Sequence, residues 1–437
     1  MVRASKNWVR AKLGEGVAEN VVSLYSAYLV NYAVPLFTVP YLIRTLGVST
    51  WGLVAMAQGL GSYLNLVVEY GFNLSATREV ARHRGVPEKI ADLVAGVVGA
   101  KALLAFAGIA LTFAFQRVIP GLQEHPRVLW AGVIAGIALG LNPMWYFQGC
   151  ERLKVVATLE VGAKTAAAAA VFIFVHHPAD AWRVPGLQAA ASLISTGAGL
   201  VLMYRKVPFC RVTVARIRQA LRTGWTLFLF RSTAMLYTSG NSFLLGLFAP
   251  PTAVGYFAGA EKISKAFMGL LNPFNQALFP RLSKLAVHDR RAGTQLLKTN
   301  AIVAGAGGCF LGLTVYVSAP LLVRILLGHE FGPAVPVLRF LAVLPLLIGL
   351  NTVLCTQWMA PMGMDRTLNK VILGASIVNV CMAVMMAPRY QQMGMAYAVV
   401  SAELFIFVVA NLILLRGRFR REPAVPAMAL PDMENPA

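Results

Sequence analysis

Apolar windows of about 20 residues recur along the whole chain, and each is long enough to cross a membrane as a helix. Of the 437 residues, 57% are hydrophobic and 13% are charged, whereas soluble domains carry about a quarter charged residues. We therefore expect an all-α integral membrane protein with about twelve transmembrane helices and no soluble domain in its short connections. The expected spans are 17–43, 51–74, 90–115, 128–149, 155–175, 184–204, 223–248, 253–277, 298–322, 335–360, 368–387 and 394–415.

Positive charge is unevenly distributed along the chain, whose formal net charge is +21. Lys and Arg concentrate in alternate connections, and an excess of them marks the cytoplasmic side of a membrane protein. We expect a cytoplasmic N-terminal segment (1–16), a basic cytoplasmic linker (205–222) and a cytoplasmic tail (416–437). Nucleic-acid binding is the alternative explanation for these runs, but topology and anionic lipid headgroups account for them. We expect no nucleic-acid partner.

Two stretches of the chain resemble each other. Residues 52–82 align without gaps on residues 255–285, and the alignment pairs Gly52 with Gly255. Chance similarity between apolar helices is the alternative, but charged residues at the helix ends also align. The sequence therefore predicts two related halves.

The halves predict two six-helix bundles, over residues 17–204 and 223–415. Six is an even number, so both bundles share one orientation, and a pseudo-twofold axis should run along the membrane normal. Transporters built from parallel repeats bind their substrate between the halves, near the middle of the membrane. We therefore expect such a site here.

Motifs of enzymatic catalysis are missing from the sequence. It contains no G-x-x-x-x-G-K-[ST] nucleotide-binding loop, no H-E-x-x-H zinc motif and no Asp-x-Asp metal motif. The pair His176-His177 near Asp180 fits a polar turn better than a metal site. We expect no metal or cofactor, and the sequence nominates no enzymatic reaction; a membrane enzyme or an assembly scaffold is the remaining alternative.

Several stretches resemble a known family of transporters. They are NYAVPLFTVPYLIRTLG (31–47), YGFNLSATREVAR (70–82) and NPMWYFQGCERLK (142–154). Together they resemble the polysaccharide-transport branch of the multidrug/oligosaccharidyl-lipid/polysaccharide (MOP) exporter superfamily, and more narrowly the Wzx-type O-antigen flippases. The resemblance is densest over residues 20–160 and continues more weakly to about 415.

The resemblance implies a V-shaped flippase of the bacterial inner membrane, with both termini in the cytoplasm. Such a protein moves an undecaprenyl-diphosphate-linked oligosaccharide from the cytoplasmic to the periplasmic leaflet, by alternating access and driven by an ion gradient. Polysaccharide polymerase and chain-length machinery are candidate partners. The alternative is a related exporter of another anionic lipid or of drugs.

Charged residues deep inside the spans are the strongest indication of a site, because each costs roughly 2.5–3.5 kcal/mol near the bilayer centre. They are the bases Lys101, Lys164, Arg231, Lys262 and Lys265 and the acids Glu160 and Glu261. Each acid has a lysine four residues later on the same helix face, so two ion pairs are expected. The remaining bases predict a water-filled cationic cavity that binds the lipid diphosphate. The alternative is that individual bases reach an interface or brace helices.

Weaker candidates complete the predicted site. Arg78 and Arg281, at equivalent helix ends, are expected either to contact the diphosphate or to fix the orientation of their helices in the membrane. Asn31 and Asn73 contact sugar or bond between helices. Glu160 and Glu261 are the candidate ion-coupling residues, since a carboxylate can take up a proton when its lysine turns to the substrate.

Overall fold

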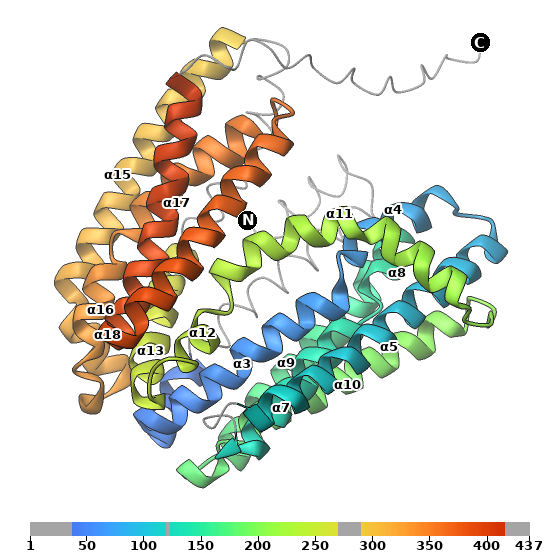
Figure 1. Ribbon diagram of the computed structural model, residues 1–437, viewed down its shortest axis with the longest axis horizontal. Coiled ribbons are helices and arrows are strands. Elements are labelled where there is room, and N and C mark those ends of the chain that lie inside the picture. The colour runs from blue at the N-terminus through green and yellow to red at the C-terminus, as the bar shows by residue number, and fades with distance from the viewer. Residues whose placement is uncertain (1–36, 119–122, 270–289, 416–437) are drawn as a thin grey trace, which may run out of the picture.

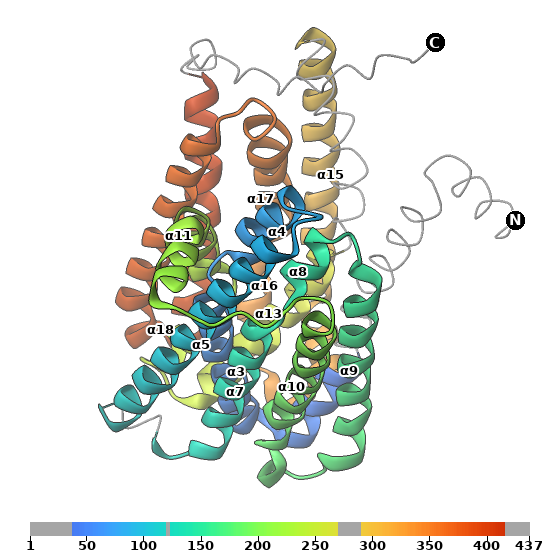
Figure 2. The same cartoon turned by 90° about the vertical axis from the view of Figure 1, so that its right-hand side faces the viewer.

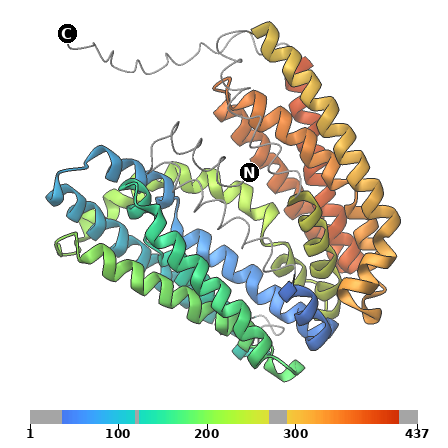
Figure 3. The ribbon, with the colours of Figure 1, turned by 180° about the vertical axis from the view of Figure 1, so that it is seen from behind.

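In the computed structural model, two groups of helices converge at one end and diverge at the other, which gives the molecule the outline of a V (Figures 1 and 3). The structure describes residues 37–118, 123–269 and 290–415. The described residues are almost entirely helical, and eight of their helices are long and apolar enough to cross a membrane. The predicted all-α membrane fold with a V shape is confirmed.

The first bundle contains the helices from the N-terminal half of the chain. These are α3 (Val48–Glu69), α4 (Phe72–Arg82), α5 (Pro87–Val118), α7 (Pro126–Leu141), α8 (Met144–Gly149), α9 (Leu153–Phe174) and α10 (Arg183–Tyr204). The central helix α3 packs against both α7 and α13, so it lies in the bundle core and at the junction of the two bundles.

The second bundle contains the helices from the C-terminal half. These are α11 (Val214–Thr238), α12 (Asn241–Gly246), α13 (Pro251–Gly269), α15 (Arg290–Leu322), the π-helix η2 (Val323–Leu327), the 3-10 helix η3 (His329–Phe331), α16 (Ala334–Leu341), α17 (Leu344–Asn351), the π-helix η4 (Thr352–Met359) and α18 (Asp365–Leu415). The long α18 is two helices joined at a kink, because Gln391 has φ 49° and ψ −123°. The expected spans 368–387 and 394–415 lie on either side of that kink.

The two bundles touch where α3 crosses α13, at two glycines that the sequence alignment pairs. A Cβ atom on Gly52 would lie 1.8 Å from the Pro251 carbonyl oxygen, and one on Gly255 would lie 2.1 Å from the Val48 carbonyl oxygen. The sequence offset that pairs Gly52 with Gly255 also pairs Val48 with Pro251. The contact of Gly52 with Pro251 is therefore repeated, with the two helices exchanged, in the contact of Gly255 with Val48. The expected pseudo-twofold relation between the bundles is visible in this contact.

Buried apolar side chains from both bundles form one continuous core around this junction. Trp51 on α3 is 1% exposed, and Phe257 on α13 is fully enclosed. The closed end of the V is therefore a buried apolar core that contains side chains of both bundles.

Helix α11 packs on both bundles. It contacts α5 and α4 in the first bundle and α18 in the second, and a perpendicular view places α11 beside α18 on one side of the molecule, opposite α9 and α15 (Figure 2). It begins at Val214, inside the stretch predicted as the basic linker, where the Thr213 side chain accepts a hydrogen bond from the Arg216 N–H at 3.4 Å. The division of the chain at 205–222 stays a prediction.

Candidate functional site

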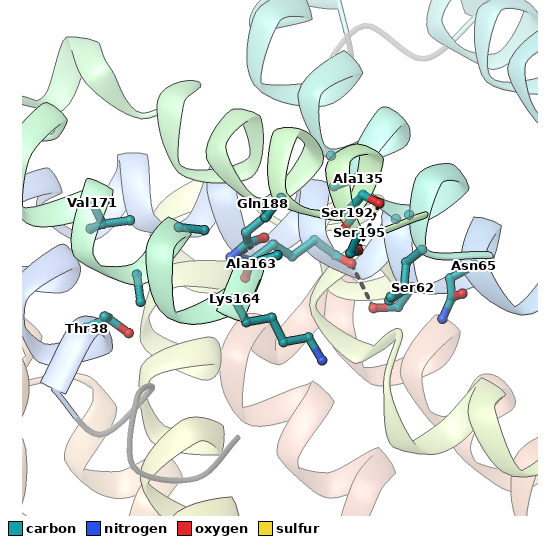
Figure 4. Close-up of a pocket in the computed structure, with 18 of the residues that line it drawn as sticks. Thr38, Ser62, Asn65, Ala135, Ala163, Lys164, Val171, Gln188, Ser192 and Ser195 are labelled. Atoms are coloured by element: carbon teal, nitrogen blue, oxygen red, sulfur yellow. Dashed lines mark hydrogen bonds between the residues drawn. The ribbon is translucent and has the colours of Figure 1, made fainter. Parts of the chain in front are cut away.

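A cavity of about 420 Å³ lies among α3, α7, α9 and α10 of the first bundle. Figure 4 shows Lys164 and Ala163 from α9 at this cavity, together with Gln188 and Ser192 from α10. Alanines and glycines line much of α9 and α7 here, and their small side chains leave the space open. We call it the α9 cavity.

Uncharged polar side chains line one part of the α9 cavity. They are Thr38, Gln58, Ser62, Asn65, Gln188, Ser192 and Ser195. Gln58 donates to Gln188 at 3.2 Å, and Ser62 donates to the Gln58 carbonyl oxygen at 2.9 Å. Amides and hydroxyls both donate and accept hydrogen bonds, as a sugar does. The wall can therefore donate hydrogen bonds to hydroxyl groups and accept hydrogen bonds from them.

Three predicted charges meet at the α9 cavity. Glu160 and Lys164 form the expected ion pair on α9, with Lys164 Nζ 2.6 Å from Glu160 Oε1. Lys262 also lines the cavity, although it belongs to α13 of the second bundle. Two lysines against one glutamate give this cavity an excess of positive charge. In the described ranges, Lys262 forms no ion pair, so its ammonium is available to an anion.

The second expected ion pair is also present, on α13. Lys265 Nζ lies 2.9 Å from Glu261 Oε1 and donates to the Thr238 carbonyl oxygen at 3.0 Å. Thr238 is the last residue of α11, where carbonyl groups lack partners within the helix. Asn241 also reaches Glu261, at 3.5 Å. Lys265 therefore joins α13 to the end of α11, and it does not line the α9 cavity.

Arg231 is paired between the bundles. Its Nη1 atom lies 3.1 Å from Glu69 Oε1, which joins α11 to the end of α3. Glu69 is 5% exposed and also accepts a hydrogen bond from the Asn73 backbone N–H at 3.0 Å. The sequence predicted Arg231 as an unpaired cavity base, but the structure gives it a carboxylate partner. Asn73 contributes its backbone to this contact.

Lys101 differs most from its prediction. It is 2% exposed, and its ammonium donates to the carbonyl oxygens of Gly140 at 2.8 Å and Asn142 at 2.9 Å. These carbonyl groups lie at the C-terminal end of α7, where no backbone N–H within the helix is left to bond them. Lys101 braces α5 against α7 and does not face a water-filled cavity.

The remaining predicted contacts lie apart from the α9 cavity. Arg78 is exposed on α4, and within the described residues it forms no ion pair. Asn31 and Arg281 lie outside the described residues. Their proposed contacts with sugar and diphosphate stay predictions.

A buried carboxylate that we did not select is Glu403 on α18. It is 7% exposed, and its Oε2 atom accepts a hydrogen bond from Asn351 Nδ2 at 2.8 Å. No Lys or Arg pairs with it in the part of the chain that the structure describes. The sequence carried a signal, because Glu403 is an acid in an apolar run with no base one turn away.

This architecture, two helix bundles that carry charged residues on apolar helices, is the fold of a class of solved membrane proteins. The inward closed conformation of the lipid II flippase MurJ superposes with a TM-score of 0.70 and 12% identity, covering 90% of this chain and 87% of MurJ. An inward-facing multidrug resistance MATE family transporter of the MOP superfamily superposes with a TM-score of 0.62 and 13% identity, covering 89% of this chain and 98% of that one. At these identities the likeness concerns the fold.

The chain belongs to the polysaccharide biosynthesis protein family, whose model matches residues 17–286. A protein of Escherichia coli (strain K12) named "Putative O-antigen transporter" is 29% identical over 389 residues, covering 89% of this chain and 94% of the relative. A Shigella dysenteriae protein of the same name is 30% identical over 401 residues, covering 89% of this chain and 97% of the relative. The predicted family is confirmed. By name these relatives are transporters and not enzymes.

Proposed function

We propose that this protein is a flippase for an undecaprenyl-diphosphate-linked oligosaccharide, such as an O-antigen or exopolysaccharide repeat unit. Its relatives are named as O-antigen transporters, and a solved structure of the same fold is named as a lipid II flippase. The observation that carries the proposal is the α9 cavity, which combines a sugar-compatible polar wall with excess positive charge.

The diphosphate and the sugar of the substrate each have a chemical counterpart in this cavity. Lys164 and Lys262 supply charge-assisted hydrogen bonds to phosphate oxygens, which are roughly twice as strong as neutral ones. The amides and hydroxyls of α3 and α10 replace the water that hydrates the sugar. A cationic drug would be repelled by the lysines, so the same charges disfavour the drug-exporter alternative.

Transport then proceeds by alternating access in the bacterial inner membrane, with both termini in the cytoplasm. The two bundles rock about the packed junction of α3 and α13, and substrate leaves on the periplasmic side. Glu160 couples this motion to an ion gradient, because it can exchange Lys164 for a proton as that lysine binds substrate. Glu261 is the second coupling residue, because it can take up a proton when Lys265 separates from it as α11 moves against α13. The bilayer and the polymerase and chain-length machinery are the partners in this scheme.

Proteoliposomes that contain a fluorescent undecaprenyl-diphosphate-linked oligosaccharide test the cavity. We expect the double variant Lys164→Gln/Lys262→Gln to lose at least about tenfold of the flipping rate, since each charge-assisted contact contributes roughly 1.5–3 kcal/mol. The charge-matched control is Lys298→Gln/Lys370→Gln, which removes two exposed lysines, on α15 and α18, that do not line the α9 cavity. Equal flipping by both variants, at equal abundance, would exclude the α9 cavity as the substrate site.

The same vesicles test ion coupling. Dissipating the proton and sodium gradients should stop flipping in the wild type, and Glu160→Gln/Glu261→Gln should make the residual rate independent of the gradients. Undiminished flipping without either gradient would remove ion coupling from the proposal.

A further inference from the structure

A second basic site lies at the start of α11, apart from the α9 cavity. It is a surface hollow of about 520 Å³ lined by Tyr70, Arg218, Leu221, Arg222 and Trp225. Tyr70 comes from the corner between α3 and α4, and the other four residues come from α11. We call it the α11 pocket.

Close backbone contacts fix the wall of the α11 pocket. Gly71 has φ 74°, and a Cβ atom there would lie 2.9 Å from the Phe228 backbone nitrogen. On the opposite helix, a Cβ atom on Gly224 would lie 3.1 Å from the Tyr70 carbonyl oxygen. The corner and α11 therefore touch backbone to backbone, which holds the Tyr70 ring at a set position on the helix.

Tyr70 occupies a backbone conformation that its residue type rarely adopts. Its φ is 49°, at the end of α3, where a helix usually ends in glycine because an L side chain is strained there. Its ring stacks on Phe228, with centroids 4.5 Å apart and planes at 13°. The Trp225 ring lies 6.4 Å from that of Tyr70, and its side chain is half exposed. A strained aromatic residue in a rigid wall indicates a functional surface.

Two arginines stand beside these rings without an acid partner. Arg218 and Arg222 are four residues apart, so their side chains share one face of α11, and both are exposed. Within the described part of the chain neither forms an ion pair, whereas their neighbour Arg216 is bonded to Asp92 at 2.7 Å. Like charges at this spacing repel each other, so an anion bound between them would relieve the repulsion.

We propose that the α11 pocket binds the phosphate-bearing headgroup of a membrane lipid and that, resting on the proposed function, this headgroup is the diphosphate of the transported lipid before it enters the α9 cavity. Arginine presents a planar fork of donors that matches two phosphate oxygens at once. Tryptophan and tyrosine favour the membrane interface, where a lipid headgroup lies beside its acyl chain. The same chemistry accepts a bulk anionic phospholipid, so the test separates the two sources.

The test measures lipid binding to the purified protein in nanodiscs of neutral lipid, by native mass spectrometry. The probes are undecaprenyl diphosphate, phosphatidylglycerol and inorganic pyrophosphate. The test variant is Arg218→Gln/Arg222→Gln. The matched control is Arg205→Gln/Arg211→Gln, which removes the same charge from exposed residues of the preceding connection. The melting temperature of each variant checks folding.

We expect the test variant to bind undecaprenyl diphosphate at least about tenfold more weakly than the wild type, and the control variant to stay within twofold. The melting temperature of the test variant should not fall, because the change removes a repulsion. If both variants weaken the binding of undecaprenyl diphosphate equally, or if neither variant weakens it, the proposal that the α11 pocket binds this lipid is wrong. Wild-type binding of phosphatidylglycerol alone, dependent on the two arginines, would keep the pocket and refute the proposed diphosphate substrate.

Discussion

The glycine contact between the bundles allows a quantitative test of how closely the two halves must approach. Replacing Gly52 with alanine would place a Cβ atom 1.8 Å from the Pro251 carbonyl oxygen, whereas real Cβ contacts stay above 3.0 Å. The helices α3 and α13 would have to separate by about 1.2 Å, the difference between those two distances. The atoms that obstruct the new methyl group are backbone atoms, which cannot rotate away.

The expected cost follows from two opposing effects. Overpacking of a tight interior typically costs about 1–3 kcal/mol, and alanine in place of glycine returns about 0.5–1 kcal/mol in a helix. We expect Gly52→Ala to lower the free energy of unfolding by about 1–2 kcal/mol. Gly255→Ala should cost nearly the same, because its Cβ meets the equivalent carbonyl oxygen at 2.1 Å.

The assay is thermal unfolding of purified variants in one detergent, together with their abundance in the membrane. Gly162→Ala on α9 is the matched control, since a Cβ atom there has nothing within 4 Å; it should stabilise by up to about 1 kcal/mol. If Gly52→Ala unfolds at the same temperature as Gly162→Ala, the bundles do not meet backbone to backbone and the symmetric junction is refuted.

Three further predictions concern charged residues. Lys101→Met should lower the free energy of unfolding by about 1–3 kcal/mol, because it leaves two buried carbonyl groups without a donor; unchanged thermal unfolding would contradict the brace. Arg231→Gln should destabilise the protein by about 1–3 kcal/mol and Arg231→Gln/Glu69→Gln by less, since only the single variant leaves a buried carboxylate unpaired; additive losses in this double-mutant cycle would disprove the coupling. The Arg84 guanidinium, 2.9 Å from the Glu151 carboxylate, lowers the pKa of Glu151 chiefly through their hydrogen bond. The ion pair therefore stabilises the fold above the unfolded-state pKa of Glu151, and this stabilisation is lost as pH falls through the folded-state pKa. The melting temperature of Arg84→Gln should depend less on acid pH than that of the wild type.

The helices could be predicted well because membrane helices are specified by long apolar windows, which need no tertiary information. The start of α11 could not, since its first turns are basic and its apolar run begins only near Trp225. A helix held by the Thr213 cap and by packing against α5 escapes a search for hydrophobicity.

The candidate site was only partly predictable, for a physical reason. Pairs on one helix, such as Glu160 with Lys164, follow from spacing alone. Partners from distant helices do not, and Lys101 shows this, because its acceptors are backbone carbonyls that no sequence pattern marks. The excess of bases over acids inside the apolar spans predicted a polar cavity, but tertiary packing determines which lysines reach the cavity.

The packing of α11 on both bundles has a consequence for the continuity of the chain. The peptide connection at 205–213 is not what holds the halves together, because α11 and the junction of α3 with α13 already do so through side chains and backbone. A protein expressed as two fragments, divided in this connection, should therefore assemble in the membrane and copurify through a tag on either one. Covalent linkage would then serve to deliver the two halves in equal amounts.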